Sequence, residues 1–459
     1  MKYEPFSNKR MVAYSLNTVI LSMMWSIRNW IQLYAAKAVG IPILYVLVIF
    51  GIYVIWDAVN DPLAGNLLDR SSIFTSKYGK RFPFIVIGII GGCLCLTLLY
   101  IPVTMDPLLL AMWILFIIIF YDAFQTLYEL SVHSLTVDMF RDQKQRVKLS
   151  TFSHIIAGIG SISLWIIVPM ILGNFGGETN PRAYLFMAFF IVSIILVMAI
   201  PHIWSVREPE EMKQLRSKLN EQGKSSSSPQ EVIIRAFKDR NWVGFIIAYV
   251  TWIVEIGCVT VGLSFYLVDG LGLPISMVGL PVVAFLLVGF AVVPLWMKVA
   301  KRIGLKKSYF YALILTSIST ASIIFARTYT LLIILAAIGG IGHGGQGVIL
   351  QAIYSEAIDN ATLISGKREE SSYVGIMRFF SATAIFWQIL IFAIVGTITG
   401  YDPQLGTKNS DFAKLGLLLQ MSLIPATLMF ISSLIFFNLY TITKETAMEN
   451  KKRLIEMDL

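Results

Sequence analysis

Long apolar runs dominate this sequence and constrain its fold more than any other feature. Each run is near or above the ~20 residues that a helix needs to cross a bilayer, and all are too long for the ~10-residue alternating strands of a membrane barrel. We therefore expect twelve membrane-spanning helices, at Met11–Ala36, Ile41–Leu68, Phe82–Tyr100, Leu108–Phe140, Leu149–Leu172, Ala183–Trp204, Trp242–Val268, Met277–Ala300, Tyr309–Ala326, Leu331–Ala357, Ser371–Ile398 and Leu415–Tyr440.

The composition excludes a soluble protein. Hydrophobic residues make up 56% of the chain and charged residues 14%, whereas soluble domains carry about 25% charged residues. In a membrane protein the net charge of +9 bears on which side of the membrane the basic residues lie, and we expect no nucleic-acid partner. The fold class predicted is an all-α, multi-pass membrane protein.

Lysine and arginine are distributed unevenly between the two sides of the predicted membrane. With the N-terminus inside, the inner segments hold 30 of the 37 basic residues when Lys298, at the inner end of its span, is counted with them; the outer segments hold five, and the remaining two, Arg28 and Arg378, lie deeper within spans. Because basic residues accumulate on the cytoplasmic side, we expect both termini to be cytoplasmic and the protein to lie in the cell membrane.

A polar stretch divides the chain into two sets of six spans. We predict an N-terminal half at 1–204, a cytoplasmic linker at 205–240 and a C-terminal half with a short cytoplasmic tail at 241–459. Basic residues with a glycine follow the second span of each half, at Gly79-Lys80-Arg81 and at Lys301 to Lys307. Two six-helix halves are the architecture of major facilitator transporters, and we expect a functional monomer.

The second predicted span contains acidic residues that are costly in a membrane. Asp57 and Asp61 are four residues apart and so share a helix face, and Asn60 flanks them. Charge in the hydrocarbon region costs at least ~2.5 kcal/mol per residue, so such groups need a reason. Carboxylate and amide oxygens suit a hard cation, which here is sodium, lithium or a proton. The alternative is that Asp61 only caps or pairs near the cytoplasmic end.

The fourth predicted span carries a polar stripe. Asp122, Thr126, Glu129 and His133 follow one another at helical spacing, and Tyr128 lies beside them. Such a stripe faces another helix or an aqueous cavity, because it cannot face lipid. The alternative to ligand binding is hydrogen bonding between helices.

The other charged residues that we place deep within spans, away from the span ends, are Arg28, Glu255 and Arg378. Five acids and two arginines would leave the interior at −3 when ionised, a deficit that a bound cation or protons would offset. Trp252 lies three residues before Glu255 and is a candidate stacking platform. His343 is interpreted as a packing residue, and the six glycines between Gly339 and Gly347 as a packing or a gating element.

Two motifs in opposite halves resemble the glycoside–pentoside–hexuronide:cation symporters, the family of the melibiose carrier. The first runs from Trp56 through Asp57, Asn60, Asp61 and Pro62 to Gly79-Lys80-Arg81-Phe82-Pro83. The second is Asp359 followed by Gly366-Lys367-Arg368-Glu369-Glu370 and Tyr373. The resemblance covers essentially the whole chain.

This resemblance implies cation-coupled uptake by alternating access. It places the cation on Asp57, Asn60, Asp61 and Thr126, as the sodium site if sodium is the coupling ion, and it places Glu129 at the family's sugar-binding aspartate. The chain departs from the family elsewhere: His133 stands where the family has a stacking tryptophan, and the first span has no acidic residue near Leu21. The galactoside half of the mechanism therefore does not carry over.

Three classes of function follow from these observations. The leading hypothesis is a symporter of a sugar, glycoside or uronide, with a small-molecule substrate, a coupling cation and no cofactor. Its substrate site would draw on Glu129, His133, Asp122, Tyr128, Arg28, Trp252, Glu255 and Arg378. The alternative is a carrier of a lysolipid or another amphiphilic or organic-acid substrate, since animal lysolipid carriers also resemble this family. A membrane enzyme is not expected, because no nucleophile–base pair or His-rich metal motif is present.

Overall fold

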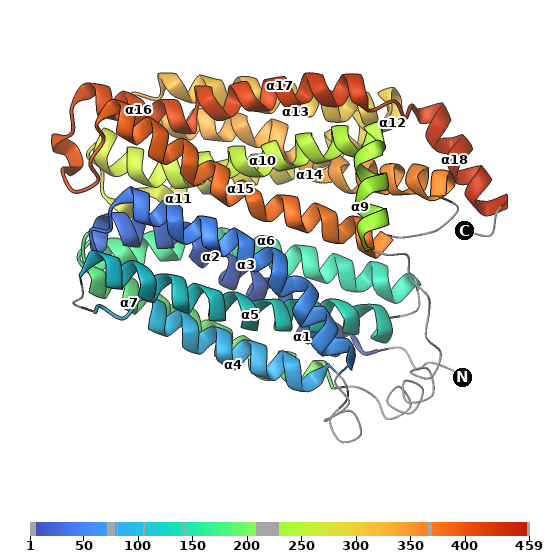
Figure 1. The fold of residues 1–459 in the computed structure, drawn as a ribbon, viewed down its shortest axis with the longest axis horizontal. Helices are drawn as coiled ribbons and strands as arrows, with labels where there is room; N and C mark the ends of the chain where they lie inside the picture. Colours follow the sequence, from blue (N-terminus) through green and yellow to red (C-terminus); the bar gives the residue numbers. More distant parts are fainter. Residues whose placement is uncertain are drawn as a thin grey trace. The chain divides into compact units, whose positions relative to one another are not determined.

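The structure is a computed structural model that describes residues 6–70, 79, 81–103, 106–140, 143–207, 229–365 and 370–456. Within these ranges the chain forms helices and no strands (Figure 1). It divides into two compact units, Met1–Ser225 and Ser226–Leu459. Most of the predicted linker, 208–228, lies outside the described residues, and its last part forms the short helix α9, Pro229–Lys238.

The first unit contains long helices that run beside one another (Figure 1). They are α1 (Asn8–Ser15), α2 (Asn17–Leu33) with a π-helical turn at Tyr34–Ala38, α3 (Ile43–Arg70), α4 (Phe82–Leu99), α5 (Pro107–Met139), α6 (Gln143–Asn174) and α7 (Pro181–Ser205). α5 packs against α3 and α4, and α2 packs against α6 and α7. A Cβ at Gly88 of α4 would lie 2.7 Å from Phe124 O, so glycine lets α4 approach the α5 backbone.

The second unit is built around α10 and α14. Its helical elements are α9, α10 (Arg240–Phe265), η2 (Tyr266–Gly270), η3 (Ile275–Val278), α11 (Gly279–Ala291), α12 (Val293–Ile303), α13 (Leu305–Ser322), η4 (Ile323–Phe325), α14 (Tyr329–Ser365), α15 (Glu370–Thr399), η5 (Gly406–Lys408), α16 (Asp411–Met421), α17 (Leu423–Leu439) and α18 (Lys444–Glu456). α10 packs against α15 and α17, whereas α14 packs against α11 and α13.

The glycine-rich segment of α14 forms close contacts with two neighbouring helices. A Cβ at Gly342 would lie 2.7 Å from Thr316 N of α13, and one at Gly344 would lie 2.7 Å from the Val292 side chain and closer still to Gly289 O of α11. The segment is continuously helical. These contacts favour packing over gating.

The described residues contain ten helices long and apolar enough to cross a membrane, or eleven if the bent pair at Ile275–Ala291 and Val293–Ile303 is one span. The 44° bend in that pair lies next to Pro294, which cannot donate a helical hydrogen bond. The predicted count of twelve is therefore not confirmed within these ranges.

The first predicted span accounts for the difference, because it is broken at Leu16. α2 has 17 residues, which is short for a span. At the break, Asn17 Nδ2 donates to Tyr14 O at 2.7 Å and Thr18 Oγ1 donates to Ser15 O at 2.8 Å. Such side-chain bonds to the preceding turn compete with the helical ladder, a local effect that hydropathy alone does not reveal.

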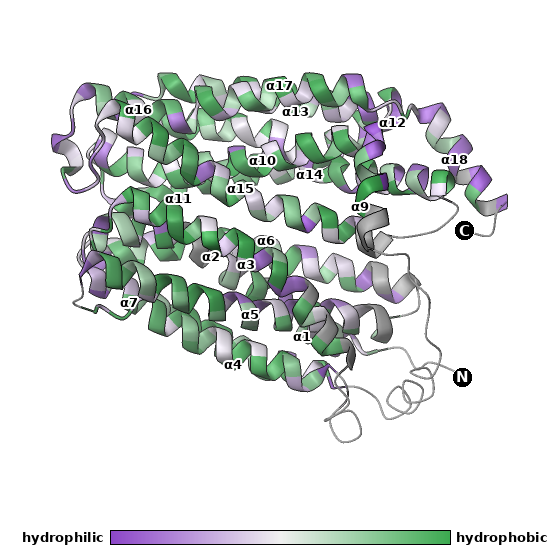
Figure 2. Cartoon of the chain, in the orientation of Figure 1, coloured by the Kyte–Doolittle hydropathy of each residue, from purple (hydrophilic) through white to green (hydrophobic). Residues whose placement is uncertain are grey.

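Much of the apolar surface of the long helices is not covered by protein. Figure 2 shows these helices to be mostly hydrophobic along their length, whereas α18 is largely hydrophilic. In the span Lys148–Asn174 only 22% of the most apolar window is buried, and Ile155 and Ile159 are 56% and 64% exposed. Exposed apolar surface on this scale requires lipid, so the protein is a multi-pass membrane protein.

Candidate functional site

The first unit brings the predicted cation-binding residues together across α3 and α5. Helical spacing places Asp57, Asn60 and Asp61 on neighbouring positions of α3, and α5 contributes Thr126. Asn60 Nδ2 donates to Thr126 Oγ1 at 3.1 Å, and the Thr126 hydroxyl donates to Asp61 Oδ1 at 3.2 Å. Three of the four residues are thus linked directly by hydrogen bonds.

Asp122 belongs to the same set of contacts, although the sequence assigns it to the substrate stripe. Its side chain is 1% exposed, and its Oδ2 accepts from Asn60 Nδ2 at 2.9 Å. Its Oδ1 lies 2.8 Å from the hydroxyl of Tyr53, which also lies 3.3 Å from Asp57 Oδ1. Asp122 therefore connects all the cation candidates through Asn60 and Tyr53.

Tyr53 is a residue that sequence reasoning missed. It is fully buried and lies four residues before Asp57, hence on the same face of α3. That spacing is the signal that could have identified it. We refer below to Tyr53, Asp57, Asn60, Asp61, Asp122 and Thr126 as the α3–α5 polar cluster.

The α3–α5 polar cluster has the donor chemistry of a site for a hard cation. It offers carboxylate, amide and hydroxyl oxygens and no nitrogen or sulfur ligand. The amide oxygen of Asn60 makes no hydrogen bond within the described part of the chain. Among those residues no group of three His, Cys, Asp or Glu side chains forms a metal site. The cluster thus fits a small monovalent ion better than a transition metal.

The C-terminal half of the α5 stripe is more accessible. His133 Nε2 lies 3.7 Å from Glu129 Oε1, and the two side chains are 62% and 13% exposed. Tyr128 does not share this surface: it is fully buried, lies against Gly88 of α4 and makes an edge contact with the ring of His202. Arg28 is part of α2, and its side chain lies outside the described residues.

The second unit contains a buried acidic residue with two polar partners. Glu255 of α10 is 1% exposed. Its Oε1 accepts from Thr320 Oγ1 of α13 at 2.6 Å, and its Oε2 lies 3.1 Å from Nε2 of His343 on α14. The sequence places Glu255 in the substrate site and gives His343 only a packing role, so it misses the contact between them.

Two further substrate candidates lie near these helices. Trp252 packs on His343 with ring centroids 6.1 Å apart. Arg378 is on α15, and its charge acts on Tyr249 of α10. Within the described residues, the basic side chain paired with Glu255 is that of His343.

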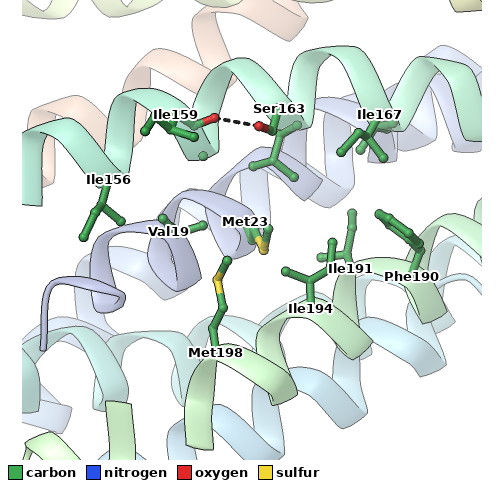
Figure 3. Close-up of a pocket in the computed structure, with 13 residues that line it drawn as sticks. Val19, Met23, Ile156, Ile159, Ser163, Ile167, Phe190, Ile191, Ile194 and Met198 are labelled. Atoms are coloured by element: carbon green, nitrogen blue, oxygen red, sulfur yellow. Dashed lines mark hydrogen bonds between the residues drawn. The ribbon is translucent and has the colours of Figure 1, made fainter. Parts of the chain in front are cut away.

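An apolar cavity in the first unit lies among α2, α6 and α7 (Figure 3). Its lining includes Val19 and Met23 of α2, Ile159 of α6 and Phe190 of α7. The one hydroxyl in the lining, on Ser163, donates to Ile159 O at 2.8 Å. No polar group is left to hold a sugar there, so the cavity suits a hydrocarbon chain.

The sequence profile of a family described as "MFS/sugar transport protein" matches residues 12–444. This match confirms the predicted resemblance and the prediction of a transporter rather than an enzyme.

Two relatives show the range of substrates among similar proteins. The isoprimeverose transporter of Lactiplantibacillus pentosus is 22% identical over 88% of this chain and 81% of its own length. The sodium-dependent lysophosphatidylcholine symporter 1-A of Danio rerio is 21% identical over 87% of this chain and 79% of its own length.

A solved structure supports the predicted fold. The nucleoside transporter NupG has a TM-score of 0.66 at 12% identity and covers 95% of this chain and all of the NupG chain. At that identity the likeness shows the fold alone, which is the major facilitator fold.

Proposed function

The chain belongs to the MFS/sugar transport protein family, and from that premise we propose that it is a cation-coupled symporter of a sugar, glycoside or uronide. The observation that carries this proposal is the α3–α5 polar cluster. Buried polar groups in a membrane protein are costly, and these ones are joined by hydrogen bonds across two helices rather than standing as isolated caps.

The coupling ion would be held by oxygens of Asp57, Asn60, Asp61 and Thr126. Asp122 would fix the amide of Asn60 by accepting its hydrogen bond, which leaves the Asn60 oxygen for the ion. Sodium, lithium or a proton would each offset part of the negative charge of the three carboxylates. Asp122 is therefore a positioning residue in this proposal, in place of the direct substrate contact expected from the sequence.

The candidate substrate-binding side chains are polar and aromatic residues, proposed for each unit by itself. In the first unit we propose Glu129 and His133, and Arg28 stays a candidate from the sequence, whereas Tyr128 is buried and Asp122 positions Asn60. In the second unit we propose Trp252 and Arg378. Glu255 would act on them indirectly, through its contact with His343, against which Trp252 packs. Binding of ion and substrate together would favour the conformational change, because a ligand shifts an equilibrium only through its different affinity for the two states.

We propose that the protein lies in the cell membrane with both termini in the cytoplasm and acts as a monomer. The support is the excess of basic residues in the segments assigned to the inside. The domain limits 1–204, 205–240 and 241–459 belong to the same proposal.

The test is sodium-driven uptake in proteoliposomes by Asp57→Cys and Asp61→Cys variants. We expect each to lose cation-stimulated uptake of a sugar panel, while Asp411→Cys, which alters an exposed aspartate, retains it. Unaltered sodium-driven transport by both variants would refute the assignment of the cation site.

A second candidate function is favoured by the apolar cavity of Figure 3. Its hydrocarbon lining would accept the acyl chain of a lysolipid, and a lysolipid symporter is among the relatives. A thermal-stability screen separates the two functions: a ligand at 100 times its Kd stabilises the native state by about 2.7 kcal/mol. Sodium-dependent stabilisation by a sugar supports the first function, and stabilisation by lysolipid alone, abolished in Ile194→Trp, supports the second.

A further inference from the structure

The second unit holds an acid and a base that face each other in its interior. The Glu255 carboxyl and the His343 imidazole approach to 3.1 Å, with side chains 1% and 8% exposed. They come from different helices, α10 and α14, and both lie within membrane spans. The contact lacks the alignment of a directed hydrogen bond, and Nδ1 of His343 has no hydrogen-bond partner in the described part of the chain.

The charge balance of this pair depends on one proton. A buried, unpaired carboxylate is strongly disfavoured in a low-dielectric interior. The Thr320 hydroxyl donates to Oε1 of Glu255 at 2.6 Å, and a hydrogen bond to the charged form favours that form. A carboxylate with a neutral imidazole would carry one net negative charge, whereas a carboxylate with an imidazolium is neutral. The geometry therefore favours a proton on His343.

Among the described residues, the elements around the pair place no other charged side chain in contact with Glu255. On its own helix the neighbouring titratable group is the Cys258 thiol, on which the Glu255 charge acts. α11 places the ring of Phe285 against His343, and α13 places Thr316 and Thr320 nearby.

Charged groups on the other helices packed against α10 and α14 have different partners or positions. Arg378 of α15 acts on Tyr249, Lys298 of α12 is exposed, and Asp269 of η2 accepts from Tyr401. The other described charged side chains of these helices lie toward the helix ends: Arg235, Lys238, Arg240, Lys301, Arg302, Lys306, Lys307, Glu356, Asp359, Asp411, Lys414 and those of α18.

We propose that Glu255 and His343 form a proton-binding site, separate from the α3–α5 polar cluster, that takes up and releases one proton during the transport cycle. Parting of α10 and α14, or entry of water, would remove the carboxylate from the imidazolium. Because an exposed histidine has a pKa near 6.5, the imidazolium would then lose its proton to water, and return to the closed pair would require a proton from water. The inference rests on the proposed transport function but not on which ion occupies the first unit.

The first test observes the proton directly. The chain has four histidines, so protein labelled with ¹⁵N-histidine gives four imidazole environments, and His343→Gln identifies the signal of interest. At about pH 8, above the ordinary pKa of histidine, we expect an imidazolium at His343. We expect Glu255→Gln to convert His343 to neutral imidazole. A neutral His343 in the wild-type protein, or an imidazolium that persists in Glu255→Gln, would overturn the proposal.

The second test asks whether the proton is exchanged during transport. Uptake by the wild-type protein should fall as the pH rises from about 6 to 9, because the open site reloads less often above the pKa of an exposed histidine. His343→Gln leaves the carboxylate unpaired and serves mainly for the assignment. Glu255→Gln/His343→Gln removes both charges, so the uptake of this double variant, divided by its own value at about pH 6, should not change with pH.

His154→Gln is the matched control, because His154 is exposed and its loss should leave the wild-type pH profile unchanged. A double variant that keeps the wild-type pH profile would show that the pair is a static ion pair, which refutes the exchange. If no variant or wild-type protein transports any substrate of the panel, the proposed transport function fails, whereas the imidazole spectrum still tests the proton site.

Discussion

A single methyl group added at Gly340 of α14 should separate two helices, whereas the same change seven residues later should not. A Cβ at Gly340 would lie 3.0 Å from Gly289 N and 3.2 Å from Phe285 C, and nearer still to Phe285 O. These are backbone atoms of α11, which cannot rotate away as a side chain can. At Gly347, on the same helix, a Cβ meets nothing within 4 Å.

The difference between the two variants follows from these contacts. Replacing glycine by alanine inside a helix stabilises it by roughly 0.5–1 kcal/mol, and this gain is common to Gly340→Ala and Gly347→Ala. Overpacking costs about 1–3 kcal/mol, and backbone neighbours place Gly340 at the upper end. Gly340→Ala should therefore be less stable than Gly347→Ala by about 3 kcal/mol. For a unit of this size, a shift of 2–4 °C per kcal/mol gives a Tm difference of roughly 6–12 °C.

The measurement is thermal unfolding of both purified variants in the same detergent, with uptake as a second readout. We expect Gly347→Ala to match or exceed the wild-type Tm. Equal Tm values for the two variants would show that α14 and α11 are not in close contact at Gly340. If Gly340→Ala kept the wild-type Tm and lost only transport, the glycines would be a gating element, and the packing interpretation would be refuted.

Two further substitutions test polar contacts. Asn60→Ala removes two hydrogen bonds, one of them to a carboxylate, and should lower the free energy of unfolding by about 2–4 kcal/mol. It should also abolish the sodium-dependent rise in Tm. Asn438→Ala, at an exposed residue, should change neither quantity. Burial and the adjacent carboxylate of Asp269 raise the pKa of the Tyr401 phenol, so it stays protonated and donates to Asp269. Tyr401→Phe should therefore lose about 1.5–3 kcal/mol relative to Tyr311→Phe, which alters an exposed ring, in the same unfolding assay.

Residues that share a helix face were predictable from the sequence because helical spacing alone places them. Asp57, Asn60 and Asp61 lie on α3 as expected, and Thr126 lies opposite them on α5. The assignment of Asp122 depended on which helix its face meets, and spacing on one helix does not contain that information. Its contact with Asn60 at 2.9 Å comes from the packing of α3 against α5.

The contact between Glu255 and His343 was not predictable for the same reason. The two residues are far apart in the chain and have no shared periodicity, so each was judged by its own helix alone. A lone histidine beside glycines is typical of packing. The glycines nevertheless let α14 lie close to its neighbouring helices. In this packing His343 lies beside a buried carboxyl, that of Glu255.

The two polar sites differ in their donor atoms, and this difference separates the ions that each can hold. The α3–α5 polar cluster offers only oxygen donors, which suit a hard cation, whereas imidazole nitrogen prefers a proton or a softer metal. The second site offers one carboxyl, one imidazole and one threonine hydroxyl. These are too few ligands for a hard metal ion; calcium, for example, takes at least six oxygen ligands. A proton, in contrast, needs one acceptor and a compensating charge, both of which His343 and Glu255 provide. Sodium dependence and pH dependence should therefore be separable by mutation, the first through Asp57 or Asp61 and the second through the double change Glu255→Gln/His343→Gln.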